Sequence, residues 1–117
     1  YEQNTAKNVE GVTRLAYQEP DSKKKIRLLT GLMGVSVPVA ATLLYFLHSG
    51  CFPIFDVRAR TTLERAGLWM RNKADASIPA WLEYVDIMGN LSQKLNVTLR
   101  ELDKALYMYG AKGATNP

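Results

Sequence analysis

Asp56 is the side chain of this sequence with the clearest opportunity for chemistry, because it directly follows the apolar residues 52–55 (FPIF). An ionised carboxylate in apolar surroundings stabilises a neighbouring positive charge strongly, since the local dielectric constant is low. Aspartate is also one of the residues preferred as a helix N-cap, and a helical pattern begins at Val57. Asp56 is therefore predicted to cap a helix, and its carboxylate is also a candidate for chemistry; one residue can fill both roles.

A short turn of small residues precedes Asp56 by about two dozen positions. Where a glycine turn joins two helices, the first N–H groups of the second helix have no partner within that helix, and the positive end of its dipole lies behind them. Such a turn can hold a phosphate group. The candidate phosphate-binding residues are Met33, Gly34, Val35, Ser36 and Val37. The alternative is an ordinary turn between two helices that binds nothing.

Basic residues favour anionic partners for this chain, whose formal net charge is +4. Lys25 lies in the basic run at 23–27, and we expect its ammonium group to stay in water and to add positive charge near the turn. Arg58 is a further candidate for contact with phosphates. Arg100 and Asp103 are a candidate internal ion pair.

Cysteine and histidine content limits the chemistry that is possible. Cys51 is the single cysteine of the sequence and His48 its single histidine. An internal disulfide and a zinc-type cluster of cysteine and histidine are therefore excluded. We expect no metal, no cofactor and a cytoplasmic location. His48 is expected to cap the end of an apolar helix, and Cys51 to be a packed thiol.

The apolar run at 35–47 is broken only by Ser36 and Thr42. A membrane-spanning helix needs about 20 predominantly apolar residues, so this run is too short to cross a bilayer. We instead expect a helix that is buried on all of its sides within a small helical domain. We also expect no membrane partner.

Hydrophobic periodicity predicts helices along nearly the whole chain and no convincing strand. Local signals mark the helix starts: Ser36, Ser77, and the capping box formed by Thr98 and Glu101. The expected fold is an all-α orthogonal bundle of about five or six helices. We expect one domain over 1–117, and the first residue, which is not methionine, is compatible with a piece of a longer chain.

Two segments carry a resemblance to a known family. LMGVSVPVA at 32–40 resembles the helix-hairpin-helix signature L-P-G-V-G-x-x-x-A of the base-excision DNA glycosylase superfamily, and FPIFDVR resembles the segment with its essential aspartate. In bifunctional members a lysine stands where this chain has Pro38, and the aspartate follows eighteen residues later, at the position of Asp56. The resemblance covers roughly 24–67, and WLEY and LRELDKALYMYG are also similar to small bacterial relatives.

The resemblance implies a helix-hairpin-helix motif at about 24–48 that binds double-stranded DNA through its turn. It also implies that Asp56 stabilises the positive charge on the sugar while the N-glycosidic bond of an extruded base breaks, as in base excision repair. The oligomeric state and the base stay open. The alternative is a non-catalytic helix-hairpin-helix module that binds nucleic acid or a protein.

Departures from the family pattern narrow the expected chemistry. Met33 replaces a proline and Ser36 replaces the second glycine of the signature. Pro38 replaces the lysine that would form a Schiff base, so any activity is expected to be that of a monofunctional glycosylase. The chain also lacks the four cysteines of an iron–sulfur loop.

Overall fold

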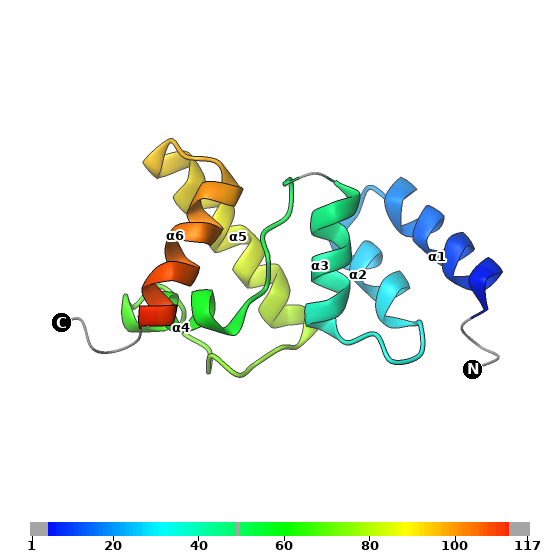
Figure 1. Ribbon diagram of the computed structural model, residues 1–117, viewed down its shortest axis with the longest axis horizontal. Helices are drawn as coiled ribbons and strands as arrows, with labels where there is room; N and C mark the ends of the chain where they lie inside the picture. The colour runs from blue at the N-terminus through cyan, green and yellow to red at the C-terminus, as the bar shows by residue number, and fades with distance from the viewer. Residues whose placement is uncertain (1–4, 49, 113–117) are drawn as a thin grey trace.

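The computed structural model describes residues 5–48 and 50–112, and these residues form six α-helices and no strand (Figure 1). The prediction of an all-α fold is therefore confirmed. The helices are α1 (Ala6–Gln18), α2 (Ser22–Thr30), α3 (Val37–Leu47), α4 (Val57–Arg65), α5 (Ile78–Leu95) and α6 (Leu99–Lys112).

Short polar side chains begin the helices where the sequence predicts. The Ser36 hydroxyl accepts a hydrogen bond from the N–H of residue 39 at 3.4 Å, and the Ser77 hydroxyl accepts one from residue 80 at 3.2 Å. Thr98 and Glu101 form a reciprocal capping box, with N···O distances of 2.9 and 3.0 Å. Each cap satisfies an N–H group that the helix itself leaves without a partner, and typically adds about 1 kcal/mol of stability.

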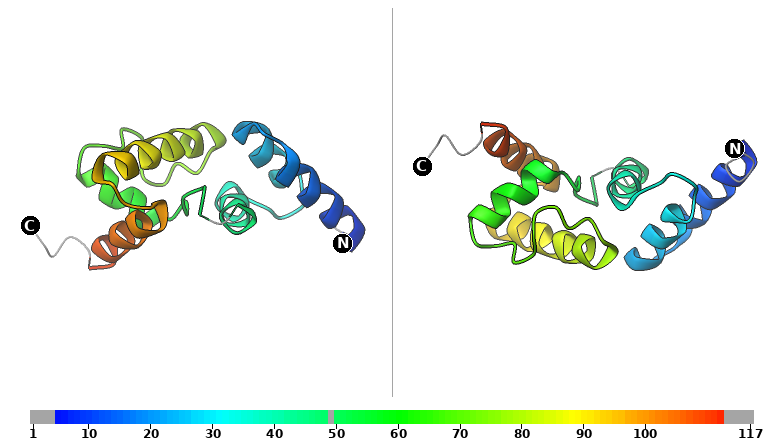
Figure 2. Two further views of the ribbon diagram at one scale, coloured as in Figure 1. Left: turned by 90° about the horizontal axis from the view of Figure 1, so that it is seen from above. Right: turned by 90° about the horizontal axis from the view of Figure 1, so that it is seen from below.

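The six helices form two groups that α5 connects (Figures 1 and 2). At one end of the molecule α1 packs on α2 and α2 on α3, and at the other end α4 packs on α6. The long helix α5 contacts α2 and α3 as well as α6. The molecule is consequently elongated, with extents of 50 × 28 × 21 Å.

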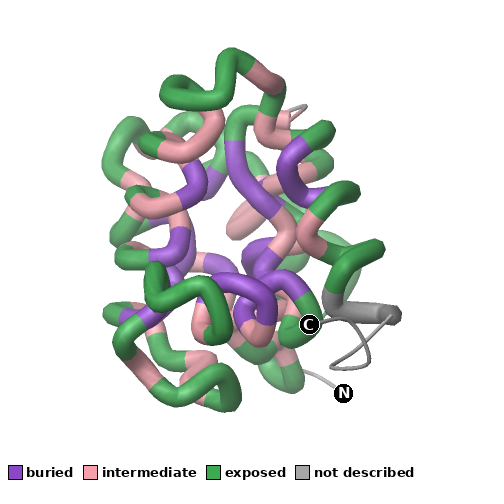
Figure 3. The backbone as a smooth tube through the Cα atoms, turned by 90° about the vertical axis from the view of Figure 1, so that its left-hand side faces the viewer, coloured by how far each residue is buried: buried purple, intermediate pink, exposed green. Residues whose placement is uncertain are grey.

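Aromatic side chains fill the region where α5 meets its neighbours. Trp81 stacks on Phe52 with ring centres 5.8 Å apart, and Tyr84 packs against Phe55 at 5.1 Å and Trp69 at 5.8 Å. All five residues are buried, and Figure 3 shows the buried residues on the sides of the helices that face one another. Such pairs contribute about 0.5–1.5 kcal/mol each beyond the area that they bury. These aromatic residues belong to the core, so they are not free to stack on a ligand.

The apolar helix α3 is not buried on all sides, and this expectation was wrong. Its inward face presents the small residues Ala40 and Ala41 together with Leu44, all fully buried. Helices α2 and α5 pack on this face, and the opposite face is open to solvent at Val39, Leu43 and Phe46. No helix among the described residues has the length and hydropathy that a membrane crossing requires.

Lys25 does not stay in water, so this expectation was also wrong. Only 5% of the residue is exposed, because the side chain turns inward from α2 toward α1 and α3. Its Nζ donates hydrogen bonds to the carbonyl oxygens of Ala16 at 2.9 Å and Tyr17 at 3.1 Å, and to Nε2 of His48 at 2.9 Å. An ammonium group has three donors, and these three acceptors use all of them. Lys25 therefore joins three helices and has no donor left for a phosphate.

His48 is the C-cap of α3, as the sequence predicts, and its backbone N–H donates to the carbonyl oxygen of Leu44 at 3.0 Å. Its ring stacks on Tyr17, with centres 5.0 Å apart. Because the Lys25 ammonium can only donate, Nε2 must accept and the ring must be neutral. Burial, and secondly the charge of Lys25, hold the pKa of His48 below its ordinary value of 6.5.

Replacing Lys25 with methionine is expected to lower the free energy of unfolding by about 1–3 kcal/mol, because one buried and two partly buried acceptors lose their donor. Urea denaturation at neutral pH measures the loss. Lys24→Met, at an exposed neighbouring position, is the matched control and should change stability by less than about 0.5 kcal/mol. Equal effects of the two substitutions would contradict the role assigned to Lys25.

Acidification is expected to weaken the fold through His48. Its pKa is lower in the folded than in the unfolded chain, so the unfolded chain binds the proton more readily. The contribution of neutral His48 is complete above pH 6.5 and falls as the pH drops below that value. His48→Gln keeps an acceptor for Lys25 but does not titrate, so its stability should change less with pH than that of the wild type in this range. Parallel curves for the two proteins would exclude this explanation.

Candidate functional site

Asp56 begins α4, and its cap role is confirmed. Its Oδ2 accepts a hydrogen bond from the backbone N–H of Arg58 at 2.9 Å. Residue 56 is half-buried, because one side of it faces the protein and the other a cleft. Capping uses one of the two carboxylate oxygens, so the cap does not prevent the carboxylate from meeting a ligand in that cleft.

The cleft lies between α3, the segment 50–56, α4 and α6, and has a volume of about 290 Å³. This is near the lower end of the range for small-ligand pockets, about 300–1,000 Å³. Tyr45 of α3 and Tyr107 of α6 line it together with Asp56. The remaining lining residues are Ile54, Ala59, Arg100, Asp103 and Lys104.

Two side chains from distant parts of the sequence hold the segment that carries Asp56. The N–H of Ile54 donates to Oδ2 of Asp103 at 3.1 Å, and the Tyr84 hydroxyl donates to the carbonyl oxygen of Ile54 at 3.0 Å. The N–H of Asp56 donates to the same carbonyl oxygen at 3.0 Å. We call this set of three hydrogen bonds the Ile54 clamp. It fixes the backbone two residues before Asp56, and therefore restricts where the Asp56 carboxylate can lie.

Asp103 is a second carboxylate of the cleft, and only 7% of it is exposed. Burial raises its pKa to about 7; the hydrogen bond from Ile54 opposes the rise, and the charge of Asp56 adds to it. Its Oδ1 is buried and has no hydrogen-bond partner among the described residues. The two carboxylates therefore lie in different environments, Asp56 partly solvated and Asp103 buried.

The expected pair of Arg100 with Asp103 is not formed, because Asp103 turns toward Ile54 instead. A sequence signal for this contact exists: Asp103 stands between Leu102 and Leu106, near the apolar face of α6, where a carboxylate needs a buried partner. The partner itself, 49 positions away, has no local signal.

Three cations surround the cleft. Arg58 lies over the ring of Tyr107, with the guanidinium carbon 4.9 Å from the ring centre, and also donates to its hydroxyl. Arg100 and Lys104 are exposed along α6 and have no ion pair within the described part of the chain. The positive charge at this site therefore comes mainly from α6, which the sequence analysis did not single out.

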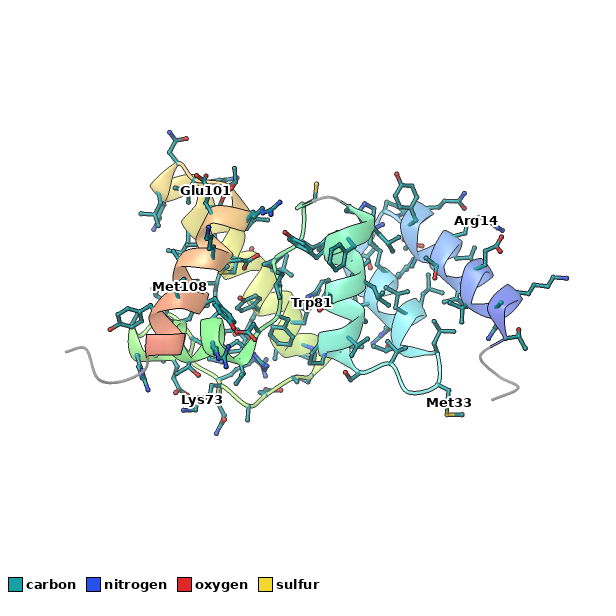
Figure 4. The ribbon with its side chains drawn as sticks, in the orientation of Figure 1. Arg14, Met33, Lys73, Trp81, Glu101 and Met108 are labelled. Carbon is teal, nitrogen blue, oxygen red and sulfur yellow. The ribbon has the colours of Figure 1, made fainter. Side chains whose placement is uncertain are left out.

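The turn residues lie apart from the cleft. Met33 projects from the turn between α2 and α3, on the far side of α3 from α6 (Figure 4). Gly34 has a positive φ of 79°, which glycine adopts without strain, and the N–H of Val35 donates to the carbonyl oxygen of residue 32 at 3.2 Å. The N–H groups of Gly34, Ser36 and Val37 have no acceptor in residues 5–48 and 50–112. The structure thus places Asp56 and Arg58 at or beside the cleft, whereas the turn residues 33–37 do not line it.

Other candidate groups are not assembled into a site. Cys51 is exposed, so the expectation of a packed thiol was wrong. The described residues contain no group of three or more histidine, cysteine, aspartate or glutamate side chains that could hold a metal ion.

Comparisons with family models, curated proteins and solved structures gave no match for this chain. The site must therefore be interpreted from its own geometry.

Asp103 is expected to make the fold less stable as the pH rises. Its pKa is about 7 in the folded chain against an ordinary 3.8, so the folded chain keeps a proton that the unfolded chain releases between these values. The free energy of unfolding should fall across this window. Asp103→Asn keeps an oxygen acceptor for the N–H of Ile54 and is neutral at every pH, so this fall should disappear. Denaturation of both proteins at a series of pH values gives the two slopes, and identical slopes would show that Asp103 does not titrate there.

Proposed function

We propose that this chain is a DNA-binding protein of the monofunctional glycosylase type, which cleaves the N-glycosidic bond of an extruded base at Asp56. The observation that carries the proposal is the position of Asp56, half-buried on the wall of a cleft whose other walls include Tyr45 and Tyr107. A cleft with a carboxylate, aromatic rings and flanking cations suits a nucleotide, which has a sugar, a base and a phosphate.

The proposed chemistry is hydrolysis. The bond between the sugar C1′ and the base nitrogen breaks, and the electron pair leaves with the base, which takes a proton from solvent. Asp56 stabilises the positive charge that develops on the sugar and accepts a proton from the water that attacks C1′. The Ile54 clamp supports this role, because a carboxylate held in place needs little reorganisation when the charge appears.

The proposed helix-hairpin-helix motif comprises α2, the turn and α3. In support, the N–H groups of Gly34, Ser36 and Val37 have no acceptor among the described residues and lie in the turn and at the first residue of α3, where the helix dipole favours an anion. Lys25 is not part of the proposed phosphate contact, since its donors are used inside the protein. The turn would bind a phosphate through its backbone N–H groups. Arg58 would supply positive charge at the cleft.

A non-catalytic binding module is the second candidate. One observation favours it: Asp56 caps α4, a structural role that explains an aspartate at this position without any reaction. In that case the cleft binds a ligand and performs no chemistry.

Substitutions of Asp56 separate the two candidates. If Asp56 acts in the transition state, Asp56→Asn should reduce base release by about 10²-fold or more while DNA affinity stays equal or increases, because the carboxylate repels phosphates in the ground state. If it only caps α4, no base is released by any form, and Asp56→Ala lowers stability by about 0.5–2 kcal/mol. The measurements are base release from a panel of lesion-containing duplexes, DNA affinity and melting temperature. Base release that persists in the Asn variant would exclude a catalytic Asp56.

A further inference from the structure

A second hollow adjoins the cleft and extends it toward α3. Its walls are Tyr45, Phe46, Gly50, Thr98 and Arg100, and its volume is about 580 Å³. Tyr45 and Arg100 line both hollows, so the two lie side by side. We call the combined feature the α3–α6 groove. It passes from the end of α3 along α6 to Tyr107, beside the segment that carries Asp56.

Two aromatic residues along this groove are exposed to solvent. Phe46 is 72% exposed and Tyr107 41%, whereas the core aromatic residues are buried. Tyr45 stands between them and lines both hollows. Exposed apolar side chains that lie together commonly mark a binding surface. Flat rings at intervals along a groove are suited to ligands with stacked planar groups.

Cations alternate with these rings. Arg100 lies where the two hollows join, and Lys104 follows one helical turn later on α6. Neither has an ion pair within the described residues, so their charge is available to an external anion. Arg58 adds a third charge at the ring of Tyr107. Side chains of this kind contact phosphates without regard to base sequence.

We propose that the α3–α6 groove binds an unpaired nucleic-acid strand, whose bases stack on Phe46 and Tyr107 and whose phosphates lie against Arg100 and Lys104. This rests on the proposed nucleic-acid-binding function and specifies its ligand. In an intact duplex the faces of the bases are covered by their neighbours, so exposed protein rings gain nothing from them. Unpaired bases present those faces, and base–ring stacking contributes about 1–3 kcal/mol per base. An acidic peptide would use the cations but not the rings.

Binding of a fluorescent oligothymidine, measured by anisotropy at two salt concentrations, tests the proposal. Single-stranded DNA should bind more tightly than a duplex of the same length. Phe46→Ala and Tyr107→Ala should each weaken binding by about 5-fold to 100-fold. Arg100→Glu combined with Lys104→Glu should weaken it further and reduce its salt dependence.

Matched controls lie outside the groove. Tyr109→Ala removes a comparably exposed ring of α6, and Lys7→Glu reverses an exposed charge on α1. Both should bind like the wild type. Phe46, Arg100 and Lys104 are exposed, so their variants should melt like the wild type, whereas Tyr107→Ala also loses its contact with Arg58 and should melt slightly lower.

Three results would overturn the inference. Duplex binding that groove substitutions leave unchanged, but that Gly34→Val abolishes, would refute the groove and retain the proposed DNA-binding function. Failure to bind any nucleic acid would refute both proposals. Equal binding of a polyglutamate peptide and the oligothymidine, unaffected by Phe46→Ala and Tyr107→Ala, would show that the groove only attracts negative charge.

Discussion

The Ile54 clamp is the set of interactions on which the site depends. The segment 50–56 forms no helix, so its buried backbone groups need side-chain partners, and Tyr84 and Asp103 provide them. The same segment packs its aromatic residues against α5 and leads directly into α4. The clamp and this packing together fix the backbone before Asp56 between α3 and α6. The hydrogen bonds of Ile54 with Tyr84 of α5 and with Asp103 of α6 therefore help to position this wall of the cleft.

The clamp places a carboxylate where its charge is costly. Asp103 has one oxygen bonded to the N–H of Ile54 and the other buried without a partner among the described residues. Its raised pKa is the consequence, since a proton removes the charge that burial disfavours. Asp56 avoids this cost because it is only half-buried and its oxygen accepts from the start of α4. The fold thus holds two carboxyl groups in unequal surroundings within one small cleft.

Part of the candidate site was predictable from the sequence. Asp56 was predicted to be a helix cap because an aspartate directly before a helical pattern is a local signal, and the structure confirms the cap. The helix starts at Ser77 and Thr98 were also predictable from local sequence, because a cap side chain accepts from an N–H only three residues away. The all-α class came from hydrophobic periodicity, which is also a local property.

The tertiary structure decided which charged and apolar groups are free to act. Lys25 was expected in water, but its ammonium group meets His48, 23 positions away, and so serves the packing of three helices. The α3–α6 groove exists because the fold places α3 and α6 on either side of the segment 50–56. This arrangement brings the exposed face of α3 near the cations of α6. The contact of Ile54 with Asp103 spans 49 positions. Local patterns specify helices because their hydrogen bonds are local, whereas burial depends on which distant segments pack together, and no short stretch of this sequence encodes that.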